Sequence, residues 1–585
     1  WVAGRHGRII GTCGGGTIPP INIERGWRSD VDRILAHIEK MNQWHRYTGT
    51  PDGEAFVDDL IRRLDEYDIP YEIETYQAYA SIPVKSSLTL SNGDDVRTIA
   101  DVYSADTTDD LYGQIIYDHW SENNNNTPEE TAIRYAAFKN KIVLSHSSGG
   151  EFANEVARYG GLALLHINKS RGGYIHHSNV SPVWGTPCIN QAHMLCVLPS
   201  VGISLEDGDK MINMLDQQDV YATLNVKMNT RIVTTRMPIV KIQGNSDKFV
   251  LLHGHYDSWY EGITDNAASD AILLELAHAF YANRDKLKRS IRIAWWSGHS
   301  DARYAGSTWY CDTHWDELNK KCVASINLDL TGCKCANQIR ARTACMEGES
   351  FTANLIKEFT GVDAKAYIPM IRGADQSFWG VHIPIHIMFK YEPTDETRVS
   401  PCPSGGPWWH TDQDTLDKLD VNILLRDLRI NAKAVCLITN SGALPVNLIE
   451  FINKVEKCLI SIQKETPDGF GMQDVLASIG NVKSACTILV ECIKDNPSTD
   501  YDAFLKSVAG ELVRLVYSAG SMYQQDLSSP YQPFGIIASS VKTAKNMHGT
   551  VLALCAKTEF IRACNRIKGQ CDAIQKMIKC YMTMA

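Results

Sequence analysis

The sequence predicts an α/β protein whose main sheet is mixed but mostly parallel, with flanking helices. Between residues 231 and 442, apolar strand-like runs alternate with segments of helical periodicity, which is the pattern of βα units around a parallel sheet. Two further observations divide the rest of the chain. Residues 110–230 hold short β-like runs of their own, and almost every segment after Leu448 has helical periodicity. We therefore expect an inserted small α/β domain and a carboxyl-terminal helical bundle.

The expected boundaries follow from these patterns. A chain of 585 residues is too long for one hydrophobic core. We assign 17–109 and 231–445 to the main domain, 110–230 to the insert and 446–585 to the helical region. The main domain opens with two helices within 30–67, followed by separate strands at 71–76 and 87–90. The helical region has apolar stretches that need a covering surface, and we expect it to pair two chains in a homodimer.

Composition and charge narrow the class of partner. The formal net charge is -10 and the basic residues are not clustered, which argues against nucleic acid or an anionic membrane surface as a partner. No apolar run approaches the length of a membrane span. We expect a peptide or small-molecule substrate, no nucleic acid and no membrane. The 17 cysteines are odd in number and spread along the chain, which favours a reducing, cytoplasmic compartment.

Polar side chains gather where the predicted strands end. His253, His255 and Asp257 alternate along one strand end and therefore share a face. Three more candidates lie at other strand or helix boundaries: Asp265, Asp329 and His410. Each has an ordinary structural explanation, such as a core histidine or a helix N-cap. Together they form an imidazole and carboxylate set that suits zinc, manganese or iron.

The order of these motifs resembles that of the M28 family of zinc aminopeptidases and carboxypeptidases. The likeness rests on His-Tyr-Asp at 255–257, Thr-Asp-Asn at 264–266, Asn-Leu-Asp at 327–329, Gly-Ala-Asp-Gln-Ser-Phe at 373–378 and His-Thr-Asp-Gln-Asp-Thr at 410–415. The insert resembles a protease-associated domain through the runs at 141–144, 160–165 and 199–204. The order of parts is similar to the glutamate carboxypeptidase and transferrin-receptor branch, whose large members commonly pair through the helical tail.

This resemblance implies the roles of the metal ligands. Asp265 would bridge two metal ions, with His255 and Asp329 completing one and His410 serving the other. Asp257 would hold the ring of His255 in its metal-binding tautomer. The implied function is hydrolysis of an amide or peptide bond by metal-activated water, with one or two divalent ions, zinc first and manganese or iron as alternatives.

The segment 295–307 departs from the family pattern of two adjacent glutamates, a general base followed by a metal ligand. Counting back from Gly306 and Ser307 puts Ser300 at the base position and Asp301 at the ligand position. A serine hydroxyl does not accept a proton near neutral pH as a carboxylate or histidine does. Two arrangements restore the chemistry. In the one we prefer, Asp301 binds metal and His299, or another histidine such as His253, is the base; in the other, His299 binds metal and Asp301 is the base.

The remaining candidates concern the substrate. Arg372, Arg303 and Arg398 lie near the motifs, and each could hold a substrate carboxylate with two hydrogen bonds. The missing glutamate also leaves two other functions open. One is a lyase or non-peptide hydrolase on the same metal scaffold, and the other is a non-catalytic receptor-like protein.

Overall fold

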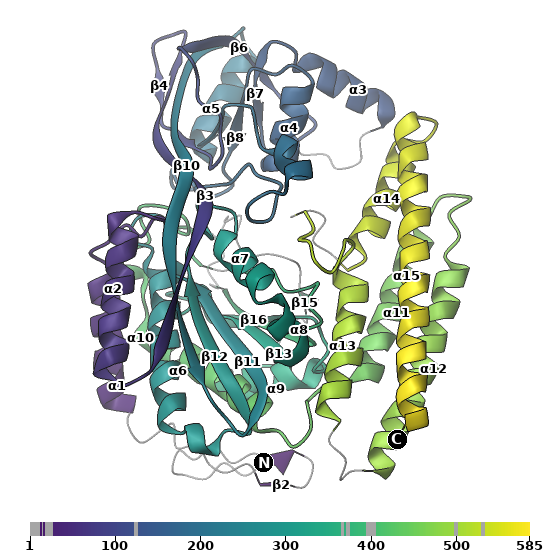
Figure 1. Ribbon diagram of the computed structural model, residues 1–585. Helices are drawn as coiled ribbons and strands as arrows, with labels where there is room; N and C mark the ends of the chain where they lie inside the picture. Colours follow the sequence, from purple (N-terminus) through teal and green to yellow (C-terminus); the bar gives the residue numbers. More distant parts are fainter. Residues whose placement is uncertain are drawn as a thin grey trace.

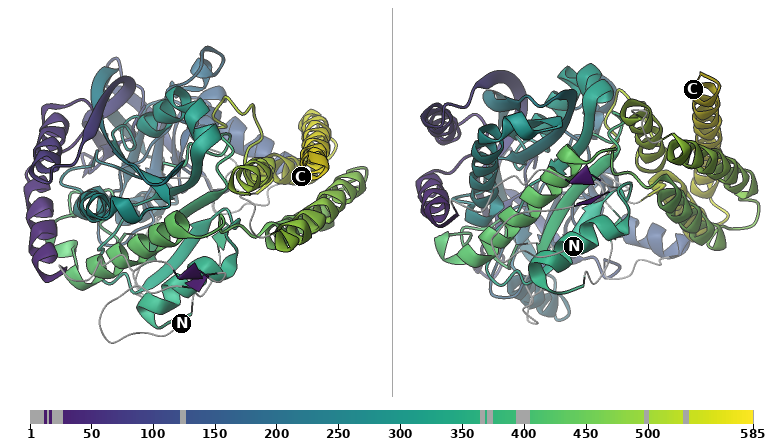
Figure 2. Two further views of the ribbon diagram at one scale, coloured as in Figure 1. Left: turned by 60° about the horizontal axis from the view of Figure 1, so that its bottom comes forward. Right: turned by 90° about the horizontal axis from the view of Figure 1, so that it is seen from below.

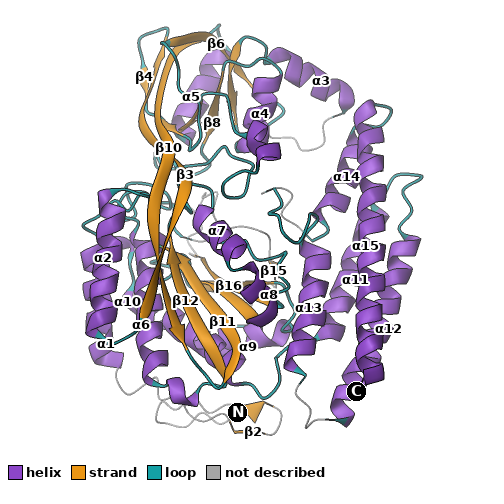
Figure 3. Ribbon diagram, viewed as in Figure 1, coloured by secondary structure: helices purple, strands orange, loops and turns teal. Residues whose placement is uncertain are grey.

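The computed structural model describes residues 27–121, 127–363, 375–392, 405–496, 501–527 and 533–584, together with two-residue strands at 12–13, 16–17 and 368–369. Its main α/β domain lies beneath a smaller α/β domain and beside a set of long helices (Figure 1). Figure 3 shows that the strands belong to the two α/β domains and that the carboxyl-terminal region is helical. The predicted fold class is confirmed.

The main sheet is built around four parallel strands made almost wholly of buried residues. They are, in spatial order, β16 (Ile385–Glu392), β13 (Cys322–Asn327), β11 (Ser246–His255) and β12 (Arg289–Trp296). Such continuous buried runs are expected of parallel strands that helices cover on both faces. The sheet becomes mixed at its flanks, where β14 (Gln338–Thr343) and β10 (Tyr221–Ile242) run antiparallel to their neighbours. β15 (Ile368–Pro369) pairs with β14 in parallel, and β1 (Thr12–Cys13) pairs separately with β2 (Gly16–Thr17).

Helices cover both faces of this sheet, because alternate side chains of each strand point to opposite sides. On β11, Val250 and Leu252 share a core with five helices: α1 (Trp27–Met41), α2 (Pro51–Glu66), α6 (Ala268–Ala282), α9 (Glu349–Thr360) and α10 (Val421–Asn440). The intervening Phe249 and Leu251 face a second core that includes α7 (Ala305–Thr313) and α8 (Trp315–Lys321). The views from below show this layering (Figure 2).

The small domain has its own parallel strands. They are β6 (Leu111–Tyr117), β7 (Lys141–Ser145), β8 (Ala163–Ile167) and β9 (Ser200–Ile203), with β4 (Asp95–Val96) and β5 (Ile99–Ala100) at the margins. Its helices are α3 (Pro128–Ala137), α4 (Gly150–Arg158) and α5 (Leu205–Leu215). The short β-like runs expected within 110–230 are confirmed by these strands.

Two long antiparallel strands run through both α/β domains. β3 (Tyr71–Leu90) pairs with β10 from Tyr71 opposite Val240 to Leu90 opposite Ala222. The second half of β10 pairs with β12 of the main sheet, and its first half pairs with β6 of the small one. The ribbon crosses from one domain to the other without a break (Figure 1). The two sheets are therefore joined through hydrogen-bonded backbone.

The predicted start of the insert at residue 110 is too late. Leu88, Leu90 and Ala100 lie in the small domain's core with Val226. We expected separate strands at 71–76 and 87–90, but β3 is continuous, and Pro83 lies opposite the irregular step between Lys227 and Met228. A bulge is where a strand tolerates proline, since the lost N–H is not needed for the ladder there.

The carboxyl-terminal region forms a helical domain against the flank of the main sheet. Its helices are α11 (Leu448–Lys464), α12 (Gln473–Asp495), α13 (Asp502–Tyr517), α14 (Gly535–Asn546) and α15 (Val551–Met584). They share one core, which also takes in Trp379 and Met388 of the main domain. The predicted helical region is confirmed, and its contact with the main domain shows that the bundle does not stand alone.

Helix α12 is, by length and composition alone, apolar enough to cross a membrane, with 22% of its apolar window buried. Its buried residues Val475, Ile479, Val482, Cys486 and Leu489 recur every three or four positions. That spacing places them on one stripe, which faces the helical core. Core helices of soluble proteins can be equally long and apolar, so α12 is weak evidence for a membrane span.

A buried arginine fixes the loop that follows β11. Arg46 is 0% exposed, and its guanidinium donates hydrogen bonds to the backbone carbonyls of Tyr256, Glu261, Gly262 and Met41. Planar, rigid donors of this kind satisfy several acceptors at once. The loop from 256 to 262 connects the end of β11 to Asp265, so Arg46 anchors the segment between two of the predicted metal ligands.

We predict that Arg46→Met lowers the free energy of unfolding by about 3 kcal/mol or more, because several buried carbonyls lose their donor at about 1–3 kcal/mol each. Urea denaturation followed by tryptophan fluorescence measures the change. Arg62→Met is the matched control, since the Arg62 side chain is 52% exposed, and it should change stability by no more than about 0.5 kcal/mol. Equal, small effects of the two substitutions would contradict the anchoring role.

Candidate metal centre and pocket

Four of the predicted metal ligands meet at the carboxyl edge of the main sheet. His255 is the last residue of β11, and Asp329 follows the end of β13. Asp265 precedes α6, within a short turn at Ile263–Ala267, and His410 lies in the loop before α10. Parallel strands bring their carboxyl ends together at one edge, which is where ligands bind in such sheets.

The distances among these side chains define a compact cluster. Nε2 of His255 lies 3.2 Å from Oδ1 of Asp265 and 3.8 Å from Oδ1 of Asp329. The other oxygen of Asp265, Oδ2, lies 3.2 Å from Nε2 of His410. Two ligand atoms that each lie about 2.0–2.1 Å from the same zinc ion are separated from each other by distances like those in this cluster. The carboxylate of Asp265 thus lies between the two histidines, as the bridging role requires.

The donor atoms also lack other partners. Within the described residues, Nε2 of His255, Oδ1 of Asp265 and Oδ1 of Asp329 are buried and have no hydrogen-bond partner. Buried polar atoms are costly when unsatisfied, and a cation among them removes that cost. One imidazole nitrogen and two carboxylate oxygens that converge in this way fit a divalent transition metal.

The electrostatics of the cluster call for a cation. Burial lowers the pKa of His255, but Asp265 and Asp329 outweigh it and hold that pKa well above its ordinary value. Burial raises the pKa of Asp265, yet the nearby imidazoles of His255 and His410 keep that pKa well below the usual range. The carboxylate of Asp265 thus stays ionised and attracts positive charge, which a divalent ion supplies in place of a proton.

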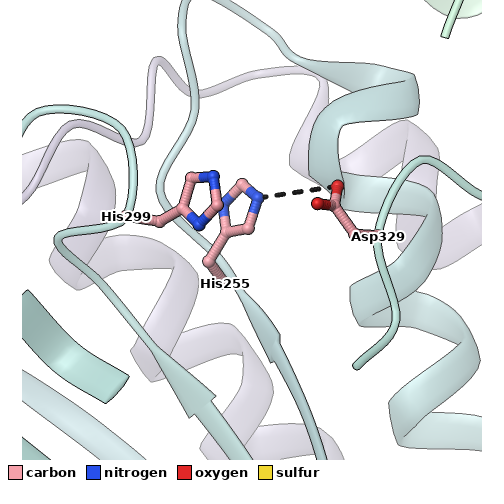
Figure 4. Close-up of side chains that lie close together, drawn as sticks. All are labelled: His255, His299 and Asp329. Atoms are coloured by element: carbon pink, nitrogen blue, oxygen red, sulfur yellow. Dashed lines mark ion pairs between the residues drawn. The ribbon is translucent and has the colours of Figure 1, made fainter. Parts of the chain in front are cut away.

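His299 lies directly against this cluster (Figure 4). His255, His299 and Asp329 each offer a ligand atom, and these atoms lie within 4.8 Å of one another. The rings of His255 and His299 are stacked, with centroids 3.7 Å apart and planes 7° from parallel. Nδ1 of His299 lies 3.0 Å from Oδ2 of the buried Asp375, so the N–H is donated to that carboxylate and Nε2 keeps its lone pair.

The stacking bears on the two roles considered for His299. An imidazole binds metal in the plane of its ring, along the nitrogen lone pair. Two parallel rings in van der Waals contact have planes separated by nearly the full 3.7 Å between their centroids, so one ion does not lie in both planes. An ion bound by His255 therefore leaves the free nitrogen of His299 available to a neighbouring water. This arrangement favours His299 as a base over His299 as a ligand.

The prediction of Asp301 as a metal ligand is not supported by its position. Asp301 is 0% exposed, and its carboxylate accepts hydrogen bonds from the backbone N–H and the hydroxyl of Thr48. It is not among the described residues that line the pocket. Burial, with the nearby charge of Asp257, raises the pKa of Asp301 to about 7. Asp301 thus holds the main domain's opening segment in place and does not reach the metal cluster as ligand or base.

Two other predictions are corrected in detail. Nδ1 of His255 donates to the backbone carbonyl of Asp257 at 2.9 Å, while the nearer carboxylate oxygen of Asp257 is 3.8 Å away. That carboxylate accepts from the backbone N–H groups of His299 and Ser300, and so it positions the base. His253 is a core histidine, 0% exposed and bonded to Ser325, and burial lowers its pKa to about 3.

Backbone from the small domain orients His410. Nδ1 of His410 donates to the carbonyl of His177 at 3.0 Å, and the N–H of His177 donates to the carbonyl of His410 at 3.0 Å. The first bond fixes the tautomer that leaves Nε2 free for metal. In the main domain, Asp414 accepts hydrogen bonds from the backbone N–H groups of Thr264 and Asp265. The metal cluster therefore depends on groups from both α/β domains.

A pocket of about 330 Å³ lies over the metal cluster, between the small and main domains. It is lined by His146, Lys169 and His176 from the small domain and by Arg303 and other residues of the main domain. Of the three predicted substrate-binding arginines, Arg303 lines this pocket. Arg372 and Arg398 lie outside the described residues. The volume is at the low end for small-molecule sites, so the pocket suits a small substrate.

Sequence reasoning missed three of the residues that organise the site. Asp375 lies in the Gly-Ala-Asp-Gln motif, so its position was marked although its role was not. Asp414 lies in the His-Thr-Asp-Gln-Asp motif in the same way. His177 acts through its backbone, 233 residues from His410 in the chain. No sequence pattern gives a signal for such a contact.

Comparison with known proteins finds similarity to peptidases. The family model described as Peptidase family M28 matches residues 239–435. The probable leucine aminopeptidase 2 of Trichophyton verrucosum is 25% identical over 310 residues, which are 52% of this chain and 57% of that protein. The chain thus spans about half the length of the curated relatives it matches.

Solved structures agree on the fold. An aminopeptidase from Aneurinibacillus sp. strain AM-1 superposes with a TM-score of 0.55 at 21% identity, covering 72% of this chain and 97% of that one. A zinc aminopeptidase from Bacillus subtilis gives 0.52 at 18% identity, covering 69% and 94%. The matched segment holds the four strand-end metal ligands and His299. Residues 239–435 of this chain are thus similar to peptidase family M28, and the similarity to solved structures extends to the fold.

Proposed function

We propose that this protein is a metal-dependent hydrolase that cleaves a peptide or amide bond in a small substrate. The observation that carries the proposal is the convergence of three buried donor atoms without hydrogen-bond partners, on His255, Asp265 and Asp329, beneath a pocket in the described part of the chain. Three protein ligands with an open position are typical of catalytic zinc sites. The family match over 239–435 supports the same chemistry.

In the proposed reaction a bound metal ion and the side chains of His299 and Asp375 have separate roles. A divalent ion held by His255, Asp265 and Asp329 supplies a Lewis acid for the carbonyl oxygen and lowers the pKa of water. His299 accepts the proton of the attacking water at Nε2, because Nδ1 is occupied by Asp375. Asp375 is suited to hold the resulting imidazolium, since the charge of His299 overcomes burial and lowers the pKa of Asp375 to about 2.

We propose zinc as the ion, with manganese and iron as alternatives that the same donors accept. One tight site is favoured over two. A second metal ion would have two ligand atoms, Oδ2 of Asp265 and Nε2 of His410, which lie 3.2 Å apart. Asp301, the third ligand expected there, is hydrogen-bonded to Thr48 instead. We also propose that the small domain is of the protease-associated type and that the protein works in a reducing compartment, since its 17 cysteines are odd in number and spread along the chain.

Metal uptake tests the site directly. We predict that the protein, stripped with chelator and reconstituted with zinc, binds close to one equivalent. Asp265→Asn should lower that uptake by at least tenfold, because the side chain loses its negative charge and one of its two oxygen ligand atoms. Asp301→Asn should keep the uptake of the wild type. Inductively coupled plasma spectrometry after gel filtration measures both, and loss of metal in Asp301→Asn alone would restore Asp301 as a ligand.

Kinetics tests the proposed base. We predict that His299→Ala lowers kcat on peptide or aminoacyl amide substrates by about 10²–10⁴-fold while metal occupancy is retained. Asp375→Asn should have a smaller effect on kcat, because His299 loses the carboxylate that accepts from its Nδ1 and orients its ring. His278→Ala is the control, since the His278 side chain is 38% exposed on α6.

Two outcomes would redirect the proposal. Loss of metal from His299→Ala would make this histidine a ligand. Metal binding without turnover of any amide by the wild type would favour a non-peptidase reaction on the same scaffold.

We further propose that the protein is a homodimer that pairs through its helical domain. Large apolar side chains are half or more exposed on α12 and α15: Ile488, Val551, Leu552 and Leu554. Exposed apolar residues that gather on neighbouring helices are typical of protein interfaces. The surface is expected to bury more than roughly 2,000 Å² in total, as permanent dimers do.

Light scattering checks the assembly. We expect twice the chain mass of 65.3 kDa at micromolar concentration, and the single-chain mass after Leu552→Glu and Leu554→Glu are combined, because buried charges are costly at an apolar interface. Ile133→Glu, at an exposed apolar position on α3 of the small domain, is the control and should leave the mass unchanged. A wild-type mass of one chain would reject the dimer.

A further inference from the structure

A tryptophan of the small domain is buried against the main domain. Trp184 lies in the segment between β8 and β9 and is 2% exposed. Its ring lies against that of Tyr304, with centroids 4.3 Å apart. Its indole Nε1–H donates a hydrogen bond to Oγ of Ser377 at 2.7 Å. One side chain of the small domain thus joins two separate segments of the main domain.

The backbone beside Trp184 is fitted closely to the start of α7. The N–H of Gly185 donates to the carbonyl of Arg303. Gly185 has a φ of 73°, and a Cβ at this position would lie 2.2 Å from Oγ1 of Thr308. Glycine adopts such a conformation readily, and its lack of a side chain permits the close approach. The position of Trp184 is therefore fixed from the neighbouring backbone as well as through its own ring.

Both segments that Trp184 contacts also contact the proposed base. The ring of Tyr304 meets that of His299 edge to face, with centroids 4.9 Å apart and planes at 77°. Two residues before Ser377, Asp375 places its carboxylate 3.0 Å from Nδ1 of His299. His299 is therefore held by Tyr304 and by Asp375, and Trp184 is bound to the segments that carry both.

Ser377 connects three parts of the protein. It is 1% exposed, and its hydroxyl lies 2.8 Å from that of Ser307 on α7. Its backbone carbonyl accepts a hydrogen bond at 2.9 Å from the side-chain amide of Gln525, in the helical domain. Buried polar groups that are hydrogen-bonded in this way rigidify their surroundings. The restraint reaches Asp375, which is only two residues away.

We propose that Trp184 is a positioning residue for His299, so that the small domain takes part in catalysis by holding the base. This inference rests on the proposed function, because it takes His299 as the base. Trp184 is not among the described residues that line the pocket, so it acts through Tyr304 and Ser377 and not on the substrate. A displacement of about 1 Å in a catalytic group can lower the rate by roughly 10²-fold.

Kinetics of a conservative variant tests this role. Trp184→Phe keeps an aromatic ring beside Tyr304 but loses the indole N–H. We expect kcat to fall by about tenfold on the amide that the wild type cleaves, while KM and zinc uptake stay unchanged, because no pocket or ligand residue is altered. Trp315→Phe is the matched control. Trp315 also donates across a domain boundary, to the carbonyl of Met522 at 3.0 Å, and its variant should keep the kcat of the wild type.

A second readout needs neither metal nor substrate. In the metal-free protein labelled with ¹⁵N-histidine, the Nδ1–H of His299 that is bonded to Asp375 should give a low-field proton resonance in the NMR spectrum. The resonance is assigned by its loss in His299→Ala. We expect Trp184→Phe to broaden or remove it, because the bond to Asp375 is no longer held, and Trp315→Phe to retain it.

The background of His299→Ala separates positioning from a general structural effect. If Trp184 acts through the base, Trp184→Phe should cause no further loss of kcat once His299 is gone. An equal loss of kcat with and without His299 would overturn the inference, and so would an unchanged kcat and resonance in Trp184→Phe. If this variant does not fold, Ser377→Ala, which removes the acceptor of the indole N–H, takes its place in the same comparisons.

These results distinguish the inference from the proposed function. A His299→Ala variant with the kcat of the wild type would reject His299 as the base, whatever Trp184→Phe does. A large loss of kcat in His299→Ala, together with an unaltered Trp184→Phe, would keep the proposed function and reject the positioning role. No turnover by the wild type, with a His299 resonance that depends on Trp184, would reject the proposed function and keep the placement of His299 by Trp184.

Discussion

The antiparallel pair formed by β3 and β10 is the constraint on which the rest of this structure depends. Its ladder runs from Tyr71 opposite Val240 to Leu90 opposite Ala222, and it enters both sheets. A twisted two-stranded ribbon of that length resists bending far more than a loop, because bending breaks interstrand hydrogen bonds. The small domain is therefore held above the carboxyl edge of the main sheet, where the metal ligands lie.

This placement gives the small domain a part in the metal chemistry. The carbonyl of His177 fixes the tautomer of His410, and the ring of His177 is stacked on Trp259 with centroids 4.2 Å apart. The same domain supplies Lys169 to the pocket wall. The candidate metal site, the pocket above it and the contact between the domains are thus linked through a few hydrogen bonds. Such coupling is common where a pocket lies between two domains.

The loop between β12 and α7 lacks the two adjacent glutamates of the family pattern, yet it places a histidine, His299, beside the candidate metal site. Gly298, Arg303 and Tyr304 all have positive φ, at 79°, 47° and 68°. The chain therefore bends twice within seven residues. The bends turn His299 toward the metal cluster and Asp301 toward Thr48. A histidine held by Asp375 then lies beside the site, and Asp257 fixes its backbone.

The sequence was sufficient to predict the fold class, the helical region and the four strand-end residues that the structure brings together. Those features depend on local rules: the period of apolar residues defines strands and helices, and polar residues at strand ends gather at one edge of a parallel sheet. Asp265, for example, was recognisable from its place before a helix and from its motif. The boundary of the insert could not be predicted, because the sequence around Pro83 resembles a gap between two strands. In the structure, long-range pairing with β10 makes this segment part of one continuous strand.

The tertiary structure alone decided the roles around the ligands. Counting residues back from Gly306 placed Asp301 at the metal, but such a count assumes that the backbone follows the same path as in the family. Three residues with positive φ give this loop a different path. The stacking of His299 on His255, the bond between His177 and His410 and the bond from Trp184 to Ser377 join residues far apart in the chain. Sequence spacing carries no information about such contacts. They arise where separate elements pack together, and their geometry is set by the packing and not by the local chain.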